Sequence, residues 1–220
     1  MNPEDLAGYI EHTVLRPGAT EADIRRVCRE TIEYGFHAAV ISPVWVSVAS
    51  EELIGRFVSI VSVAGFPFGA SRSETKIVEA VRAAIDGASE IDMVAGIGWL
   101  QAGEFRKAED EISQLRRTLP PEVALKVIIE APLLSLQQQI DATHLVINSG
   151  AQFVKTGTGT QGPVTVEQVR TLARAAQNKV QIKAAGGIRT AEQCYELLEA
   201  GAARLGSSAS VDIMTSLRKH

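Results

Sequence analysis

Two cysteines in 220 residues are too few for a disulfide framework, which excludes the small secreted scaffolds that depend on one. The sequence also lacks any run of about eighteen apolar residues, so it predicts no transmembrane helix. Its first residues, MNPEDLAGYI, are acidic and do not follow the basic-then-apolar order of a signal peptide. We therefore expect a cytoplasmic protein that does not bind a membrane.

An excess of positive charge is missing as well. The 22 lysines and arginines are outnumbered by 26 aspartates and glutamates, and the net charge of -4 predicts no nucleic-acid partner. His37, His144 and His220 show no metal-ligand spacing with one another or with a cysteine, so the sequence requires no metal. Hydrophobic residues make up 45% of the chain, enough to bury a core without metals or disulfides.

The dominant pattern is an alternation of short apolar runs with longer amphipathic segments. Strands that are buried on both faces are continuously apolar, and most of these runs have that character. The eight predicted strands span residues 12–15, 38–42, 58–64, 90–95, 125–130, 153–156, 180–184 and 203–205. Because the early Gly-x-Gly-x-x-Gly turn of a dinucleotide-binding sheet is absent, a closed barrel is favoured over an open sheet.

Helix signals fill the spaces between these strands. Thr20 is a predicted N-cap and Gly35 a predicted helix end, and Gly201 is the expected C-cap of a later helix. The other predicted helices span 74–86, 105–119, 165–176 and 190–200. The fold prediction is α/β: a single-domain (β/α)₈ TIM barrel over residues 1–220, with a short N-terminal helix.

Ionisable side chains interrupt several of the apolar strands. Asp92, Lys155 and Lys183 lie in predicted strands four, six and seven, and Lys126 lies in strand five. Buried charges are costly unless they are paired, so structural ion pairs are one explanation. In a barrel, however, these strands converge on one central volume near the C-terminal mouth, where active sites lie. This convergence favours a catalytic explanation.

Amine catalysis accounts for this set of residues. A lysine amine that attacks a carbonyl gives an iminium ion, which permits C–C cleavage or enolisation next to it. At an ordinary pKa only about one lysine in 2,500 is neutral at pH 7. Lys183 is expected to lower the pKa of Lys155 by like-charge repulsion, and a shift of about three units would make roughly a quarter of it neutral. Asp92 is expected to transfer protons.

A phosphate site is predicted after the last two strands. Gly186 and Gly187 follow strand seven, and Gly206, Ser207 and Ser208 follow strand eight. Barrel enzymes often bind phosphate with these two loops, and we expect both serines to open the last helix and face an anion. Ordinary strand-to-helix turns are the alternative. His12 is expected to be structural, and Glu130 to shape the mouth or pair with a lysine.

These stretches together resemble the deoxyribose-phosphate aldolase family over nearly the whole chain. The matching segments are IEHTVLRP, VAGFPFGAS, GASEIDMVAGIG, LKVIIE, GAQFVKTGTG, IKAAGGIRT and GAARLGSSA, in the family's order and spacing. The resemblance implies a class I lyase without metal or cofactor, acting on a small phosphorylated sugar, 2-deoxy-D-ribose 5-phosphate. It also suggests that two copies of the chain associate.

The resemblance implies a role for each matched residue. Lys155 forms the Schiff base, Lys183 tunes it, Asp92 shares in proton transfer and Thr158 contacts a substrate hydroxyl. The implied phosphate contacts are Gly186, Gly187, Gly206, Ser207 and Ser208.

The chain also departs from the family pattern. Glu11 stands where aspartate is usual, and Gly157 stands where serine is usual. Gly96 stands where many relatives have asparagine, and Ala131 replaces a common threonine. The tail SLRKH lacks the terminal tyrosine of some relatives. These changes leave the reaction type intact but leave the exact sugar open. The alternatives are a related aldolase for another sugar or aldehyde, a phosphate-binding barrel isomerase without a covalent intermediate, and a barrel that only binds.

Overall fold

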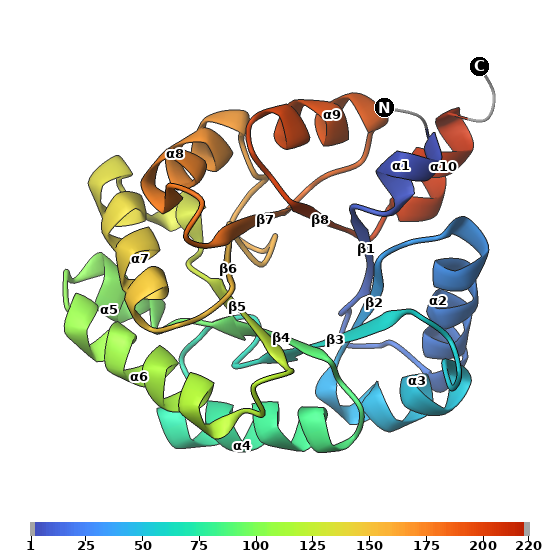
Figure 1. Ribbon diagram of the computed structural model, residues 1–220, viewed down its shortest axis with the longest axis horizontal. Coiled ribbons are helices and arrows are strands. Elements are labelled where there is room, and N and C mark those ends of the chain that lie inside the picture. Colours follow the sequence, from blue (N-terminus) through green and yellow to red (C-terminus); the bar gives the residue numbers. More distant parts are fainter. Residues whose placement is uncertain (1–2, 218–220) are drawn as a thin grey trace.

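A computed structural model describes residues 3–217, and its eight strands close into a parallel barrel in chain order, with β1 paired to both β2 and β8 (Figure 1). The tail beyond Leu217 lies outside the described residues. The strands are β1 (Ile10–Val14), β2 (Ala38–Ile41), β3 (Ser59–Ala64), β4 (Glu90–Val94), β5 (Ala124–Ile128), β6 (Phe153–Lys155), β7 (Gln181–Ala185) and β8 (Arg204–Ser207). The predicted TIM barrel is confirmed.

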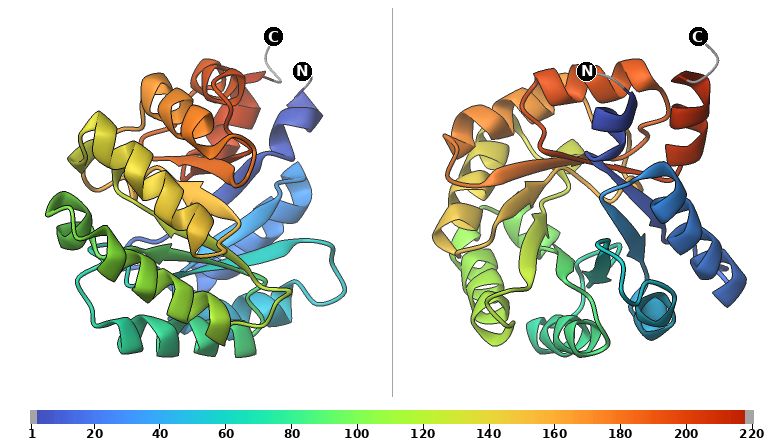
Figure 2. Two further views of the ribbon diagram at one scale, coloured as in Figure 1. Left: turned by 60° about the vertical axis from the view of Figure 1, so that its left-hand side comes forward. Right: turned by 45° about the vertical axis from the view of Figure 1, so that its right-hand side comes forward.

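Helices form the outer ring of the barrel in all views (Figures 1 and 2). They are α1 (Pro3–Ala7), α2 (Glu21–Tyr34), α3 (Val46–Glu52), α4 (Ser73–Ile85), α5 (Ile97–Gln101), α6 (Phe105–Thr118), α7 (Leu136–Asn148), α8 (Val166–Ala176), α9 (Ala191–Glu199) and α10 (Ser210–Leu217), with 3-10 turns η1 (Pro43–Trp45) and η2 (Ala131–Leu133). The expected short N-terminal helix is α1, which packs beside α10. Among residues 3–217, no helix has both the length and the apolar character needed to cross a membrane.

All eight predicted strands are present, and no end differs from its predicted position by more than two residues. Thr20 caps α2 through a capping box, and Gly35 ends that helix in the left-handed conformation, both as predicted. The sequence patterns missed α7, although Ser135 and Gln138 form a capping box at its start. The prediction of Gly201 as a C-cap was wrong by one residue, because Ala200 occupies that position.

The interior of the barrel has an apolar part and an ionic part. Ala38, Val40 and Val61 form a small apolar cluster, apart from the main core that lies between barrel and helices. The charged residues predicted to be inside, with Glu11 added, are all buried on the other strands. Alternate residues of a barrel strand point inward, so single charges in apolar strands can gather at one point without disturbing the outer core.

A second buried ion pair joins α4 to α6. The Lys76 ammonium lies 2.9 Å from a carboxylate oxygen of Glu111 and donates to the carbonyl of Val94 at 2.9 Å. The same carboxylate accepts from the Gly96 amide and from the Ser73 hydroxyl. Both charged side chains are buried, and the pair fixes the end of β4 and the turn after it.

We expect Glu111→Leu to lower the free energy of unfolding by about 3–5 kcal/mol, because it leaves the Lys76 ammonium unpaired in the core. The double variant Lys76→Met/Glu111→Leu removes both charges and should lose clearly less. Urea unfolding followed by circular dichroism measures both. If the double variant is as unstable as the single one, the hydrogen bonds of Glu111, and not the charge of Lys76, dominate.

Candidate active site

The carboxylate of Asp92, on β4, contacts all three interior lysines. One of its oxygens lies 2.7 Å from the Lys155 amine and 2.5 Å from the Lys183 amine. The other oxygen accepts from Lys126 at 3.1 Å. Asp92, Lys126 and Lys183 are fully buried, whereas Lys155 is 4% exposed. The structure therefore brings together the three residues predicted to be catalytic, and Lys155 is the one that reaches the mouth.

Two further carboxylates complete the cluster. Glu11, on β1, pairs with Lys183 and lies 3.5 Å from Lys126. Glu90, on β4, pairs with Lys126 and lies 3.3 Å from the imidazole of His37. The parallel register explains this assembly, because Lys155 lies beside Lys183 across β6 and β7, and Asp92 lies beside Lys126 across β4 and β5. The cluster holds three carboxylates and three lysines, so its net charge is zero when every carboxylate is ionised and every lysine is protonated.

Burial and neighbouring charges act together on the protonation of this cluster. Burial by itself raises the pKa of Asp92, but the charges of Lys126, Lys155 and Lys183 outweigh it and hold the pKa well below its ordinary value. Burial of Lys126 lowers its pKa, but Asp92, Glu11 and Glu90 outweigh that effect and raise the pKa. Asp92 and Lys126 are therefore held in their charged forms.

The pKa of Lys155 is lowered, which increases the neutral fraction of its amine. Burial is the largest cause, and the charge of Lys183 adds to it, so that the pKa falls to about 8 although Asp92 raises it. The charge of Lys183 acts in the predicted direction, but burial, which the sequence argument did not weigh, contributes more. At a pKa of about 8, roughly a tenth of the amine is neutral at pH 7.

A cavity of about 240 Å³ opens above Lys155 at the C-terminal mouth of the barrel. Its lining includes all the predicted phosphate contacts, together with Thr158 and Gly159 from the loop after β6. Thr13 and Leu15, from β1 and the residue after it, also line the cavity. Lys155 and the two glycine- and serine-rich loops thus line one cavity.

The two loops that close this cavity differ in what they offer an anion. Gly186 and Gly187 both have positive φ, of 119° and 68°, and successive amides in such a turn form an anion-binding concavity. The expectation that Ser207 and Ser208 open the last helix was wrong, because β8 includes Ser207 and α10 begins at Ser210. The Ser207 hydroxyl donates to the Ile188 carbonyl and accepts from the Ala209 amide, so it joins the two loops. Ser208 is exposed at the mouth.

Arg189 is a candidate site residue that the sequence argument missed. It lines the cavity next to Gly187 and Ser208, and its side chain is exposed. Apart from Lys155, it is the one positively charged residue in this lining. Its position two residues after the glycine pair was a signal that could have identified it.

Glu130 and Thr158 form a pair that the sequence analysis did not anticipate. The Glu130 carboxylate accepts the Thr158 amide at 3.2 Å and the Thr158 hydroxyl at 2.6 Å, and Glu130 does not pair with a lysine. A side chain at Gly157 would place its Cβ 2.7 Å from this carboxylate. The Thr158 hydroxyl also accepts from the Thr160 amide at 3.2 Å and lies 2.8 Å from the Thr160 hydroxyl, so its hydrogen bonds are already made within the protein.

His12 and the two cysteines lie away from the cavity. His12 faces outward from β1 and bonds Glu30 on α2 at 2.8 Å, which agrees with a structural role. Cys28 and Cys194 are fully buried on α2 and α9, and burial raises the pKa of each thiol, to about 11 and about 12. Among the described residues, no group of three or more histidines, cysteines, aspartates and glutamates is arranged to hold a metal ion.

This arrangement can support covalent chemistry on a carbonyl compound. The Lys155 amine is partly neutral at physiological pH and can attack a carbonyl carbon. A carboxylate 2.7 Å away can take up and return protons. The far end of the same cavity offers backbone amides and Arg189 to an anionic group, so a small molecule with a carbonyl at one end and an anion at the other would fit these groups.

Comparison with known proteins points to one family. Residues 7–213 match the family model described as DeoC/LacD family aldolase. The deoxyribose-phosphate aldolase of Aciduliprofundum boonei is 44% identical over 220 residues, which cover 99% of each chain. The one from Thermosynechococcus vestitus is 43% identical over 210 residues, 96% of each chain. The deoxyribose phosphate aldolase from Aeropyrum pernix, described as a unique tetramer, superposes with a TM-score of 0.88 at 34% identity, covering 99% of this chain and 92% of that one.

We expect Lys183→Leu to raise the pKa of Lys155 by about one unit or more, because it removes a like charge from a buried neighbour and leaves Asp92 less compensated. The ¹³C shift of Lys155 Cε, followed through a pH titration of lysine-labelled protein, reports this pKa. Lys183→Arg keeps the charge and should leave the pKa low, and Lys107→Leu, at an exposed site, should leave it unchanged. An unaltered Lys155 titration in Lys183→Leu would mean that burial alone sets the pKa.

Proposed function

The chain belongs to the DeoC/LacD family of aldolases, and we propose that it cleaves 2-deoxy-D-ribose 5-phosphate reversibly to D-glyceraldehyde 3-phosphate and acetaldehyde. The reaction proceeds through a Schiff base on Lys155, with residues 1–220 acting as one catalytic domain. The observation that carries the proposal is the partly neutral Lys155 amine, paired with Asp92 in a cavity whose far end is suited to a phosphate.

The proposed reaction begins with the open-chain sugar. The neutral Lys155 amine attacks C1, and Asp92 moves the protons that turn the carbinolamine hydroxyl into water. The iminium draws the electrons of the C2–C3 bond as the C3 hydroxyl loses its proton, which releases glyceraldehyde 3-phosphate and leaves an enamine. Protonation of C2 and hydrolysis then return the amine and free acetaldehyde. Lys183 adds to the effect of burial in lowering the pKa of Lys155, which raises the neutral fraction of the amine, and it also pairs with Asp92.

The proposed phosphate site is the end of the cavity between the loops after β7 and β8. The amides of Gly186, Gly187, Gly206, Ser207 and Ser208 bind the anion, and Arg189 contributes its charge. The Thr158 proton is donated to Glu130, so Thr158 accepts a hydrogen bond from a sugar hydroxyl, which takes the place of the Thr160 hydroxyl now 2.8 Å away. This arrangement fixes the substrate at both ends, with C1 at Lys155.

We also propose that the chain associates with a second copy. The Aeropyrum pernix relative is described as a tetramer, which supports association in this family.

Borohydride reduction in the presence of deoxyribose 5-phosphate tests the covalent step. We expect one reduced adduct on Lys155 by peptide mass spectrometry, because only an iminium is converted to a stable secondary amine. Lys155→Ala should lose both the adduct and the cleavage activity while keeping its circular dichroism spectrum, and Lys107→Ala should keep both. Activity of Lys155→Ala within about tenfold of the unaltered protein would exclude the proposed mechanism, since loss of a nucleophile costs far more than that.

The phosphate assignment has a separate test. Ser208→Asp places a carboxylate at the proposed anion site, so we expect KM for the phosphorylated sugar to rise at least about tenfold, equivalent to about 1.4 kcal/mol. Unphosphorylated 2-deoxyribose should be affected much less. Ser208→Asn controls for the larger side chain and should change both KM values little. Equal losses for the two sugars in Ser208→Asp would place the phosphate elsewhere.

A further inference from the structure

Glu130 is a buried carboxylate that has no basic partner in the part of the chain that the structure describes. Each of the other carboxylates buried in residues 3–217 pairs with a lysine or an arginine; these are Glu11, Asp23, Asp92 and Glu111. Removing a carboxylate from water is costly unless it is paired or hydrogen-bonded. Glu130 therefore depends on hydrogen-bond donors, and those that the described residues supply all belong to Thr158.

The backbone of Glu130 is also unusual. At the turn between β5 and η2 it adopts φ 51° and ψ 57°, a left-handed conformation that residues with a Cβ rarely take. The other non-glycine residues with positive φ in the described chain, Gln177 and Asn178, are exposed and follow α8. Strained residues held in place by their surroundings cluster at functional sites. In Glu130 the strain and the missing cation occur together, beside a loop that lines the cavity.

The hydrogen bonds of the Thr158 hydroxyl run in one direction. An ionised carboxylate can only accept, so Thr158 donates its one hydroxyl proton to Glu130, 2.6 Å away. The same hydroxyl accepts from the Thr160 amide and lies 2.8 Å from the Thr160 hydroxyl. Because Thr158 has no second proton, Thr160 is the donor in that contact. Thr158 therefore presents a lone pair, and not a proton, at the place where the Thr160 hydroxyl now lies.

Gly157 leaves room for the Glu130 carboxylate. A Cβ at Gly157 would lie 2.7 Å from a carboxylate oxygen of Glu130 and 3.7 Å from the ring of Pro132. Gly157 is not among the glycines with positive φ, so space, and not backbone conformation, explains the glycine here. Any larger side chain at this position would push the carboxylate away from Thr158.

Thr158 lies between the reactive amine and the phosphate loops. It lines the same cavity as Lys155. The next residue, Gly159, lies against the glycine pair, since a Cβ added at Gly186 would be 3.4 Å from the Gly159 Cα. In the proposed substrate C1 is bound to the amine and C5 carries the phosphate. The hydroxyl on C4, next to the phosphate-bearing carbon, is therefore the one that faces Thr158.

We propose that Glu130 is a positioning residue that determines specificity: it holds the Thr158 proton, so that Thr158 accepts a hydrogen bond from the C4 hydroxyl. This inference rests on the proposed function. The C4 hydroxyl replaces the Thr160 hydroxyl as donor, and the contact of Thr158 with Glu130 stays intact. A group at C4 that can only accept meets a lone pair and is disfavoured. A C4 without a hydroxyl leaves Thr158 to Thr160.

Competitive inhibition by analogues of the three-carbon product measures this contact without the chemistry. The probes are the alcohol made by reducing D-glyceraldehyde 3-phosphate and two versions of it, with hydrogen or fluorine in place of the middle hydroxyl, which corresponds to the hydroxyl on C4. For the unaltered protein, we expect the hydroxyl probe to bind at least about fivefold more tightly than either of the others, the effect of one hydrogen bond.

Glu130→Gln should reduce this ratio to within about twofold, because the new amide group can donate to Thr158 and release its proton. KM for deoxyribose 5-phosphate should rise while kcat changes little, as expected when binding is lost equally from the ground and transition states. A purely structural role would instead weaken all three probes equally.

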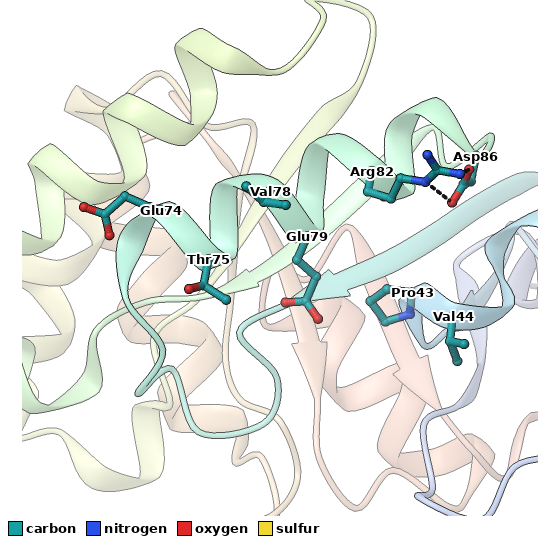
Figure 3. A pocket seen from close by; sticks show the side chains of 8 residues that line it. All are labelled: Pro43, Val44, Glu74, Thr75, Val78, Glu79, Arg82 and Asp86. Atoms are coloured by element: carbon teal, nitrogen blue, oxygen red, sulfur yellow. Dashed lines mark hydrogen bonds and ion pairs between the residues drawn. The ribbon is translucent and has the colours of Figure 1, made fainter.

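Three further variants complete the test. Gly157→Ala displaces the carboxylate without removing it and should reduce the ratio in the same way. Thr160→Val removes the competing donor and should increase the ratio. Glu74→Gln is the matched control, because Glu74 lies at an outer groove between α4 and η1 (Figure 3), with 70% of its side chain exposed. It should leave all three inhibition constants unchanged.

Borohydride trapping of acetaldehyde on Lys155 separates this proposal from the proposed function. The adduct should form in the unaltered protein and in Glu130→Gln alike, because acetaldehyde has no C4 hydroxyl. A ratio near one in the unaltered protein, a ratio unchanged in both Glu130→Gln and Gly157→Ala, or equal weakening of all three probes would each overturn the proposal for Glu130 alone. An unaltered protein that forms no adduct would overturn the proposed function, and this inference with it.

Discussion

The contact on which the rest of the barrel interior depends is the carboxylate of Asp92 held between three lysine ammonium groups. Buried charges are stable only when they are paired, and here each charge has partners from a different strand. The cluster balances when Lys155 is protonated and carries one excess negative charge when Lys155 is neutral. On the proposed mechanism, the iminium restores the missing positive charge. The same balance that keeps the barrel folded therefore favours the covalent intermediate over the free amine.

The parallel register of the strands brings these charged residues together at one place in the barrel. The register aligns Asp92 with Lys126 and Lys155 with Lys183. Because inward side chains of all strands face the same narrow interior, these residues and Glu11 converge although they are far apart in sequence. The residues Ala38, Val40 and Val61 form a separate apolar cluster on β2 and β3, which contribute no charged group to the ionic cluster. Lys155 is 4% exposed and lines the cavity at the mouth. Position in the barrel therefore gives Lys155 its lowered pKa, mainly through burial.

The strands and the charged residues within them could be predicted because continuous apolar runs and isolated charges are local signals. The helix α7 was missed because its first turn, after Ser135, consists of leucine and three glutamines with no apolar periodicity. The sequence could not predict which polar side chains interact with one another. Glu130 and Thr158 are 28 positions apart, and Lys76 and Glu111 are 35 positions apart. The hydroxyl of Ser207 illustrates the same limit, because its use in joining two loops depends on how those loops pack.

The interlocked charges of the barrel interior also constrain how this sequence can evolve. Replacing any one of Glu11, Asp92, Lys126 or Lys183 leaves an uncompensated charge in the core, and such a change is destabilising by itself. Replacing two partners together can leave the stability nearly unchanged. Accepted substitutions at these positions are therefore expected to occur in pairs, and their effects on stability are strongly non-additive. A lineage that no longer needed the chemistry would therefore be expected to keep most of these charges for a long time. The presence of these charged residues in a sequence is therefore evidence for a stabilising role as well as for a catalytic one.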